Sequence, residues 1–297
     1  MFQGSMTALV TPMHEDGSLD KKSFQELIEW QISSKTDALI IVGTTGESAT
    51  LDHEEQAQLI HWAIKQAAGR IPIIAGCGTN STRSTIELTL NAQKLGAQAG
   101  LLITPYYNKP TQDGLYRHFK RVTEETDLPL ILYNNPGRTG CDLLPETIQR
   151  LSELPQIIGV KEATGDLERA KEIIKRCPNP FALYSGVDEI NLELMQLGAQ
   201  GSISVTANIA PAKMAALCAL ALKKDWKAAE ALNQELSALN KKLFLESNPI
   251  PSKWALHQMG LIPPGIRLPL TTLHPKYHPE VNSAMQQAGV VNHHVKV

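Results

Sequence analysis

A lysine at the end of a short apolar run is the first candidate for chemistry in this chain. Residues 157–161 read Ile-Ile-Gly-Val-Lys, so the ammonium group of Lys161 stands at the end of a predicted strand that is otherwise apolar. A lysine amine enclosed in a pocket can attack a carbonyl carbon and form a Schiff base. A lysine in this position can also lay its stem on apolar surface and extend its charge to water. Lys161 is therefore a candidate nucleophile with a simpler alternative.

A loop rich in glycine and threonine is the second candidate. Residues 43–47 read Gly-Thr-Thr-Gly-Glu and lie between a predicted strand and a predicted helix, for which Asp52 and Glu55 can form a capping box. Two glycines let successive N–H groups face one anion, and the hydroxyls of Thr44 and Thr45 add donors. A carboxylate or phosphate suits such a loop. A tight turn whose threonines bond their own backbone is equally compatible with the pattern.

Tyrosines and an arginine gather at two further strand ends. The chain is only 5% aromatic, yet three of its six tyrosines lie there, at Tyr106, Tyr107 and Tyr133. A phenol hydroxyl in that position can relay protons, which we expect for Tyr133. For Tyr106 and Tyr107 an amphipathic rim or a subunit contact is equally open. Arg138 follows Tyr133 on a Pro-Gly turn, where it can hold a carboxylate through two hydrogen bonds or simply be solvated.

Other patterns argue against cofactors. Residues 76–81 read Gly-Cys-Gly-Thr-Asn-Ser, with a serine in place of the third glycine of the dinucleotide fingerprint, and no acid ends the next strand, so we expect no NAD. The histidines near the C-terminus lack metal-site spacing, which predicts no metal centre. The cysteines stand far apart without a C-x-x-C pair, which favours a reducing compartment over a disulfide scaffold. They are Cys77, Cys141, Cys177 and Cys218.

These side chains need a scaffold that brings several strand ends together. Short runs rich in Val, Ile and Leu alternate with longer amphipathic stretches, which is the pattern of βα units around a parallel sheet. We predict eight strands, at residues 7–10, 38–42, 71–75, 100–104, 130–133, 157–161, 181–184 and 201–205. Eight such units favour a closed (β/α)8 TIM barrel, whose active site lies at the C-terminal ends of the strands.

A helical extension is predicted beyond the barrel. Barrel helices are expected at residues 20–33, 52–68, 81–95, 111–126 and 211–222, among others. A further helix over 226–246 has leucines at spacings of 4, 3 and 4, namely Leu232, Leu236, Leu239 and Leu243. This seam is shorter than the about 3–4 heptads of a coiled coil, so we expect it to pack on the barrel. The remaining chain reads as irregular and then helical. We predict a barrel over residues 1–223 and a C-terminal helical extension over residues 224–297.

The charge balance excludes some partners. The 297 residues include 28 Lys and Arg against 30 Asp and Glu, a net charge of −2, so we expect no binding to nucleic acid or an anionic membrane. No apolar run reaches the roughly 18 residues of a membrane span, and no basic segment precedes an apolar one at the N-terminus. We therefore expect a cytoplasmic protein, with enough apolar residues, 42%, for a sizeable core.

Several of these motifs together resemble the dihydrodipicolinate synthase family, within the wider class of pyruvate-dependent Schiff-base aldolases. The resemblance rests on Gly-Thr-Thr-Gly-Glu at 43–47, Tyr-Asn-Asn-Pro-Gly-Arg-Thr-Gly at 133–140 and Gly-Val-Lys-Glu-Ala-Thr at 159–164. Thr-Pro-Tyr-Tyr-Asn-Lys-Pro at 104–110, Ser-Val-Thr-Ala-Asn at 204–208 and Asn-Pro-Ile-Pro at 248–251 extend it over nearly the whole chain. It implies a lyase that condenses pyruvate with L-aspartate 4-semialdehyde in diaminopimelate and lysine biosynthesis.

The resemblance also implies catalytic roles. Lys161 would form the Schiff base with pyruvate, and Thr44 and Thr45 would bind the pyruvate carboxylate. Tyr133 would shuttle protons and would be linked through Thr44 to Tyr107, which in this family reaches across a subunit interface into the partner's site.

Further implications concern the second substrate and the assembly. Arg138 would steer the carboxylate of aspartate semialdehyde at the mouth of the site, while Ile203 and Gly186 would line the pocket. The family resemblance implies no metal and no organic cofactor, because the Schiff base itself takes up the electrons. It also suggests a homotetramer built as a pair of tight dimers.

A regulatory site can be compared position by position. In feedback-inhibited members lysine binds a separate interface site, whose matching positions here are Ser48, Ala49, His53, Gln56, Asn80, Ser84 and Tyr106. Lysine-sensitive enterobacterial members have a histidine and a glutamate where this chain has Gln56 and Ser84. Without the glutamate a ligand ammonium would lose one opposite charge, so we predict weak or absent lysine inhibition.

Two other functions stay open from the sequence. A sister aldolase such as N-acetylneuraminate lyase, acting on a sialic or sugar-derived 2-oxo acid, is disfavoured by the Gly-Arg-Thr-Gly context of Arg138. A non-catalytic barrel kept for binding is disfavoured because the candidate catalytic residues are all present, namely Lys161, Tyr133, Thr44 and Tyr107.

Overall fold

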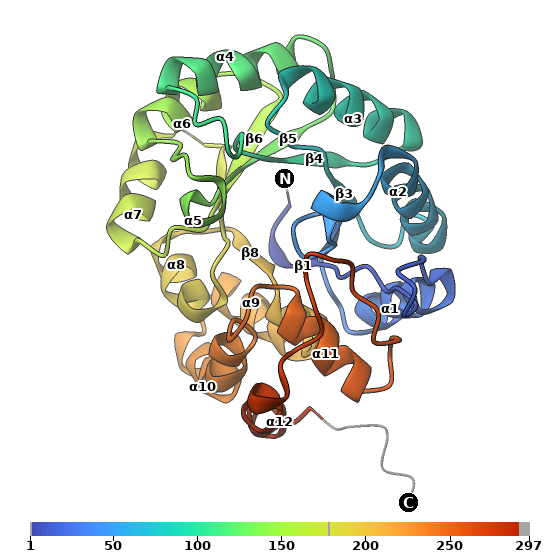
Figure 1. Ribbon diagram of the computed structural model, residues 1–297. Coiled ribbons are helices and arrows are strands. Elements are labelled where there is room, and N and C mark those ends of the chain that lie inside the picture. The colour runs from blue at the N-terminus through green and yellow to red at the C-terminus, as the bar shows by residue number, and fades with distance from the viewer. Residues whose placement is uncertain (1, 178, 291–297) are drawn as a thin grey trace, which may run out of the picture.

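The computed structural model describes residues 2–177 and 179–290, and its centre is a closed barrel of eight parallel strands. Each strand pairs with the next one in the sequence, and β8 closes the ring on β1. The strands are β1 (Gly4–Ala8), β2 (Ala38–Ile41), β3 (Ile73–Gly76), β4 (Ala99–Ile103), β5 (Leu130–Asn134), β6 (Ile157–Glu162), β7 (Ala182–Ser185) and β8 (Gly201–Ser204). The predicted TIM barrel is confirmed, and Figure 1 looks into its ring of strands.

Helices surround the barrel and continue beyond it. The barrel helices are α1 (Lys21–Ser33), α2 (His53–Ala67), α3 (Thr82–Leu95), α4 (Gln112–Thr123), α6 (Pro145–Ser152), α7 (Leu167–Arg176), α8 (Asn191–Leu197) and α9 (Pro211–Leu222). One short helix, α5 (Pro136–Thr139), follows β5, and four 3-10 turns lie at Ser48–Thr50, Asp188–Ile190, Thr206–Asn208 and Pro275–Tyr277. The predicted capping box of Asp52 and Glu55 is present at the start of α2.

The first strand lies earlier in the chain than the pattern predicts. The sequence predicts residues 7–10, but β1 begins at Gly4 because Gly4 pairs with Gly201 of β8. A Cβ on Gly201 would lie 2.1 Å from the Gly4 carbonyl oxygen, which explains why glycine is needed there. At the other end, the Val10 N–H donates to Asn208 Oδ1 at 3.0 Å, so the chain leaves the sheet while its apolar side chains stay buried.

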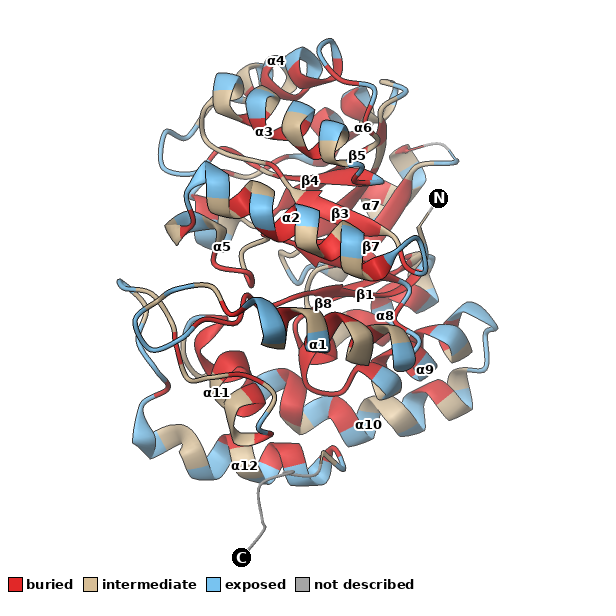
Figure 2. Cartoon of the chain, turned by 90° about the vertical axis from the view of Figure 1, so that its right-hand side faces the viewer, coloured by how far each residue is buried: buried red, intermediate tan, exposed pale blue. Residues whose placement is uncertain are grey.

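The C-terminal segment packs on one side of the barrel. It consists of α10 (Trp226–Lys242), α11 (Ile250–Gln258) and α12 (His278–Gln287), which lie together beside α9 in Figures 1 and 2. Three of the four leucines in the predicted seam, Leu236, Leu239 and Leu243, are inaccessible to solvent, and Leu232 is partly buried. The α10 helix packs against α9 and ends at Lys242, earlier than predicted. Residues 291–297 of the predicted extension, with His293 and His294, lie outside the described residues.

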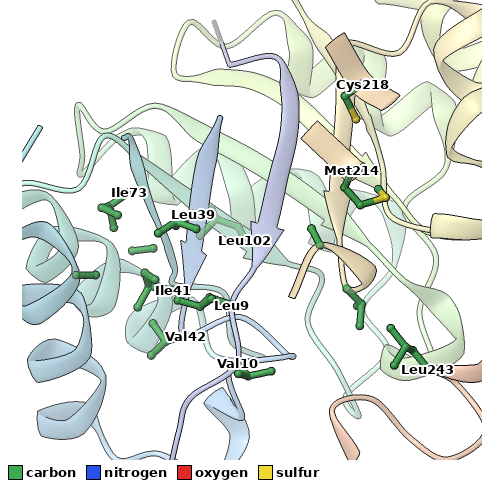
Figure 3. Packing of buried hydrophobic residues seen from close by; sticks show 14 of the residues in the cluster. Leu9, Val10, Leu39, Ile41, Val42, Ile73, Leu102, Met214, Cys218 and Leu243 are labelled. Atoms are coloured by element: carbon green, nitrogen blue, oxygen red, sulfur yellow. The ribbon is translucent and has the colours of Figure 1, made fainter. Parts of the chain in front are cut away.

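Alternation along the strands divides the core into two layers. Side chains such as Leu9, Leu39, Ile41 and Ile73 pack between the strands and the helices, and Figure 3 shows part of this cluster. Their strand neighbours point into the barrel, where Met6, Ile40, Ile74, Leu101, Ile131, Tyr133, Tyr184 and Ile203 form a second cluster. Both faces of the sheet are thus covered, as expected for a parallel barrel, and the strands are almost wholly buried in Figure 2.

Candidate functional site

Lys161 and Tyr133 meet inside the mouth of the barrel. They occupy paired positions of β6 and β5, and Tyr184 of β7 stands in register with Lys161 on the other side. Lys161 is only 5% exposed, and its Nζ lies 4.4 Å from the centre of the Tyr133 ring. The side chain is enclosed and does not reach water. Of the two alternatives for this lysine, the structure supports the enclosed amine.

Small and apolar residues leave room around the Lys161 side chain. A Cβ on Gly186 would lie 3.1 Å from Lys161 Cε and 2.7 Å from Ala163 Cβ, so only glycine fits without displacing the lysine. Ile203 is buried in the same interior cluster as Tyr133 and Tyr184. Both residues that the sequence places at the pocket therefore lie near Lys161 or in the layer beside it.

A polar network on the opposite face of the same strands was missed by the sequence analysis. Asn134 Nδ2 donates to Asp142 Oδ1 at 2.9 Å and to Glu162 Oε2 at 3.2 Å. Arg169 pairs with Glu162 at 3.2 Å and with Asp142 at 2.9 Å. These contacts clamp β5 to β6 just behind Tyr133 and Lys161. The presence of Asn134 and Glu162 in otherwise apolar strands could have predicted this network, because buried polar groups need partners.

The loop after β2 contains two strained residues. Val42 and Glu47 have left-handed backbones, with φ of 53° and 59°, which is uncommon for any residue other than glycine and an outlier for a β-branched one. Gly76 accommodates this path, since a Cβ there would lie 2.2 Å from the Val42 carbonyl oxygen. Within the described ranges, the N–H groups of Thr44 and Thr45 donate to no acceptor. Thr44 lines the same cavity as Tyr133, so its N–H is available to a ligand there.

The tyrosine hydroxyl beside Lys161 is placed to ionise more easily than an ordinary phenol. Tyr133 Oη accepts a hydrogen bond from Asn135 Nδ2 at 3.1 Å. Burial raises the pKa of Tyr133, but the Lys161 charge and the Asn135 hydrogen bond, with smaller effects of Arg138 and the Thr44 hydroxyl, outweigh it. The pKa of Tyr133 therefore lies below its usual value, which suits a group that exchanges protons.

Arg138 and Tyr107 stand at the rim. Arg138 is exposed on α5, and its guanidinium donates to the carbonyl oxygen of Asn248 at 3.2 Å. Tyr107 is 89% exposed with a φ of 75°, while its backbone N–H donates to the Thr139 carbonyl oxygen. The structure of a single chain therefore brings Arg138 to the site but leaves the Tyr107 side chain in solvent.

One cavity of about 390 Å³ joins the candidate site to part of the predicted regulatory site. Its lining includes Thr44, Tyr133 and Arg138 on one side and, on the other, Ser48, Ala49, His53, Gln56 and Tyr106. Asn80 and Ser84 do not line it. The Asn80 carbonyl oxygen instead accepts from Asn108, and the Ser84 hydroxyl bonds to Ser81.

Gln56 has a structural partner set of its own. Its side-chain amide nitrogen, Nε2, donates to the carbonyl oxygens of Ser48 and Leu51 at 3.3 and 3.2 Å. These bonds tie the start of α2 to the preceding 3-10 turn. The amide donors of Gln56 are therefore directed to the backbone.

Metal-holding clusters and membrane-spanning helices are both absent from the described residues. Residues 2–177 and 179–290 contain no group of three or more His, Cys, Asp or Glu side chains arranged to hold a metal ion. Over the same ranges, no helix has both the length and the apolar character needed to cross a membrane.

The sequence and the fold both match known proteins. Residues 1–288 match the Dihydrodipicolinate synthetase family. The chain is 57% identical to a 4-hydroxy-tetrahydrodipicolinate synthase of Pseudomonas aeruginosa over 291 residues, which cover 98% of this chain and 100% of the relative. A protein of the same name from Methylococcus capsulatus is also 57% identical over 291 residues, with the same coverage. A crystal structure of a chloride-inhibited dihydrodipicolinate synthase from Acinetobacter baumannii, complexed with pyruvate, is similar with a TM-score of 0.97 and 55% identity, covering 98% and 100% of the two chains.

Proposed function

The chain belongs to the dihydrodipicolinate synthetase family, and on that premise we propose that it condenses pyruvate with L-aspartate 4-semialdehyde to give 4-hydroxy-tetrahydrodipicolinate. This reaction serves diaminopimelate and lysine biosynthesis. The observation that carries the assignment is the enclosed amine of Lys161, 4.4 Å from the centre of the Tyr133 ring at the C-terminal ends of the strands.

In the proposed mechanism Lys161 is the nucleophile. Its amine attacks the ketone carbon of pyruvate, water leaves, and the resulting iminium makes the methyl group acidic, because the iminium takes up the electrons when a proton departs. The enamine then attacks the aldehyde carbon of the second substrate. The amine of that substrate displaces Lys161 from the former ketone carbon, and the ring closes. None of these steps calls for a metal or an organic cofactor.

The pyruvate carboxylate would lie against the loop after β2. The free N–H groups of Thr44 and Thr45 are suitable donors to a carboxylate. The Thr45 hydroxyl accepts from Asn248 Nδ2 at 2.9 Å and so keeps its own proton for a ligand oxygen. Gly186 and Ile203 would line the space around the bound ketone.

Proton transfer would run through Tyr133. Its lowered pKa brings it closer to neutral pH, where a group can both accept and give a proton. Thr44 would link Tyr133 to Tyr107. Because Tyr107 is exposed in the single chain, the tyrosine completing this relay would come from the partner subunit.

Arg138 would hold the carboxylate of aspartate semialdehyde. Its guanidinium is exposed at the rim and is tethered by one hydrogen bond to Asn248, which leaves further N–H groups for an incoming anion. Binding at the rim would steer the aldehyde toward the enamine.

The same proposal includes the assembly and the regulation. We expect a homotetramer, a cytoplasmic location, and two functional regions, the barrel at 1–223 and the extension at 224–297. We also expect no strong lysine inhibition at Ser48, Ala49, His53, Asn80 and Tyr106, because the Gln56 amide bonds to the backbone and Ser84 carries no charge. Initial rates with millimolar lysine test this, and strong inhibition would contradict it. Sedimentation analysis tests the tetramer.

Borohydride trapping tests the central claim. The protein is treated with borohydride in the presence of pyruvate, digested and mapped by mass spectrometry. We expect a reduced pyruvate adduct on Lys161 and none on Lys253, a second buried lysine outside the barrel mouth. No adduct, or an adduct elsewhere, would contradict the mechanism. Coupled assays with aspartate semialdehyde and with N-acetylneuraminate then distinguish the two aldolase classes.

A further inference from the structure

The loop that carries Thr44 and Thr45 is bracketed by strain. Val42 and Glu47 both have left-handed φ values, and each such residue costs about 1–2 kcal/mol. Strained backbones persist only where surrounding groups hold them. The groups that hold this loop therefore determine whether its two threonines face the barrel mouth.

Part of the support comes from the barrel itself. The Thr11 hydroxyl donates to the Gly46 carbonyl oxygen at 2.7 Å, and the Gly43 carbonyl oxygen accepts from the Gly46 N–H at 3.0 Å. These bonds hold the backbone of the turn. They leave the side chains of Thr45 and Glu47 to other partners.

These other partners come from the C-terminal segment. Asn248 Nδ2 donates to the Thr45 hydroxyl at 2.9 Å, and the backbone N–H of Arg267 donates to Glu47 Oε2 at 3.1 Å. Lys253 of α11 forms an ion pair with Glu47 Oε1. Residues more than 200 positions away along the chain thus contact both ends of the Thr45–Glu47 turn.

The ion pair is deeply buried. The side chains of Lys253 and Glu47 are 3% and 1% exposed. Burial lowers the pKa of Lys253, and the neighbouring Glu47 carboxylate opposes this effect. A buried pair loses so much hydration that apolar or neutral replacements are often equally stable, so stability alone is a weak reason for its presence. Fixing the direction of a loop is a better reason.

Asn248 also reaches the other side of the barrel mouth. Its side chain contacts Thr45 after β2, while its carbonyl oxygen accepts from Arg138 on α5. One residue of the C-terminal segment therefore touches both groups assigned to substrate carboxylates. The motif Asn-Pro-Ile-Pro at 248–251, which has no assigned role in the chemistry, starts at this residue.

We propose that Lys253 and Asn248 are positioning residues, which hold the Thr44–Thr45 loop so that its donors face the pyruvate carboxylate. This inference rests on the proposed function. It assigns the C-terminal segment a direct part in pyruvate binding, in addition to covering the barrel.

The first test removes the ion pair without leaving a lone buried charge. In the variant E47Q/K253M both side chains are neutral, and the Gln carbonyl can still accept from the Arg267 N–H. We expect a thermal midpoint close to wild type, a pyruvate KM at least about tenfold higher, and an equal rise in the pyruvate concentration that half-saturates borohydride trapping. K242M is the matched control, because it breaks the exposed pair of Lys242 with Glu280 in the same segment and should change neither value.

The second test separates the two contacts of Asn248. N248A removes the amide but keeps the carbonyl that binds Arg138, so the pyruvate KM should rise about fivefold or more while the KM for aspartate semialdehyde stays within twofold. A general structural defect would raise both. Unchanged pyruvate values in a folded E47Q/K253M protein would overturn the positioning role.

A measurement without substrate tests the anchoring of the loop separately from the proposed reaction. Amide hydrogen exchange of Gly46, Glu47 and Ser48, whose N–H groups bond within the turn, should be faster in E47Q/K253M than in wild type and K242M, because the loop loses its anchor in the C-terminal segment. Absence of any pyruvate adduct in the wild-type protein would contradict the proposed function. Unchanged exchange in this loop would contradict the anchoring by Lys253, whatever the substrate.

Discussion

The two faces of β5 and β6 carry buried polar side chains with opposite uses. Glu162 and Asn134 point outward, and their oxygens and nitrogen bond to Arg169, Asp142 and backbone groups. Lys161, one residue before Glu162, points inward, lies over an aromatic ring, and forms no ion pair within residues 2–177 and 179–290. The polar network of Asn134, Asp142, Glu162 and Arg169, called the outer network below, thus has its hydrogen-bonding groups paired within the fold.

A structural polar residue and a reactive one can be distinguished by the hydrogen-bond partners that the fold gives them. Both sets are buried and both come from the same two strands, so burial and position along the strand do not distinguish them. What differs is the hydrogen-bonding capacity that the fold leaves unused. Substitutions on the inner face should therefore change rates, whereas substitutions on the outer face should change stability.

The largest effect is expected on the inner face. Lys161→Met removes the amine and should lower the rate at least about 10³-fold and abolish the pyruvate adduct, while the apolar side chain keeps the fold. The measurements are initial rates and borohydride trapping. If K161M kept a tenth of the wild-type activity, Lys161 would not be the nucleophile.

The matching change on the outer face should act on stability. Arg169→Met leaves Glu162, which is 2% exposed, without its cation, and we expect a loss of about 3 kcal/mol in the free energy of unfolding. Urea denaturation measures this. Arg117→Met, which breaks an exposed pair with Asp113, is the control and should leave the stability nearly unchanged. In R169M the folded protein should still form the adduct, and its loss would contradict a purely structural role for the outer network.

Two tyrosines inside the barrel allow the same comparison between a proposed reactive group and a group paired by the fold. Tyr133→Phe should lower kcat about 10²–10³-fold without preventing adduct formation, because a proton-transfer group is lost. Tyr184→Phe is matched to it. The Tyr184 hydroxyl donates to the Phe2 carbonyl oxygen at 2.9 Å, so its removal should cost about 1 kcal/mol of stability and leave kcat within a few-fold.

The same pair can be followed by titration. Burial raises the pKa of Tyr184, whereas the pKa of Tyr133 is lowered overall by its charged and hydrogen-bonding neighbours. The tyrosinate absorbance at 295 nm should therefore contain a component that titrates below pH 10. This component should disappear in Y133F and persist in Y184F. Equal titrations of the two variants would mean that Lys161 does not act on the Tyr133 phenol.

A buried histidine away from the barrel mouth tests whether unused hydrogen-bonding capacity always marks a site. His118 is 6% exposed, its Nδ1 lies 2.9 Å from the Thr82 hydroxyl oxygen, and its Nε2 has no partner among the described residues. Burial lowers the pKa of His118 from 6.5 to about 4. The folded protein therefore binds this proton less readily than the unfolded chain does. Stability is complete above pH 6.5 and is lost as the pH falls toward 4, by about 3 kcal/mol at most.

Urea denaturation at pH 7 and pH 5 measures this loss. His118→Asn removes the titrating ring and should reduce the acid sensitivity, while the rate at neutral pH should stay close to that of wild type. An unchanged pH dependence in H118N would show that the pKa of His118 is the same in the folded and unfolded states.

Local patterns in the sequence predicted the barrel and the inner residues well. Apolar runs of four or five residues mark the strands, and a closed barrel brings the C-terminal ends of these strands together. The sequence therefore predicts that Lys161, Tyr133 and Thr44 lie at the same end of the barrel. In the structure Lys161 Nζ lies over the Tyr133 ring, and Tyr133 and Thr44 line one cavity. The leucine spacing in residues 232–243 likewise predicts a buried face of α10.

Contacts between distant segments were not predictable in the same way. Nothing in the local pattern around Glu47 points to Lys253, and nothing around Asp142 points to Arg169, since the tertiary fold brings each pair together. The exposure of Tyr107 is a similar case. The role proposed for Tyr107 lies in a neighbouring subunit, so its side-chain contacts within one chain would not reveal that role.

The C-terminal anchors of the Thr44–Thr45 loop also set an order for protein synthesis. Thr45 and Asn248 are 203 residues apart, and Glu47 and Lys253 are 206 residues apart. At about 5–20 residues per second, the ribosome needs roughly 10–40 s to deliver the anchors after the loop has been made. During that interval the nascent chain can pair its early strands, but its strained loop lacks its anchor in the C-terminal segment. Under the proposed anchoring, the strands of the barrel are complete on the ribosome before the Thr44–Thr45 loop can bind pyruvate.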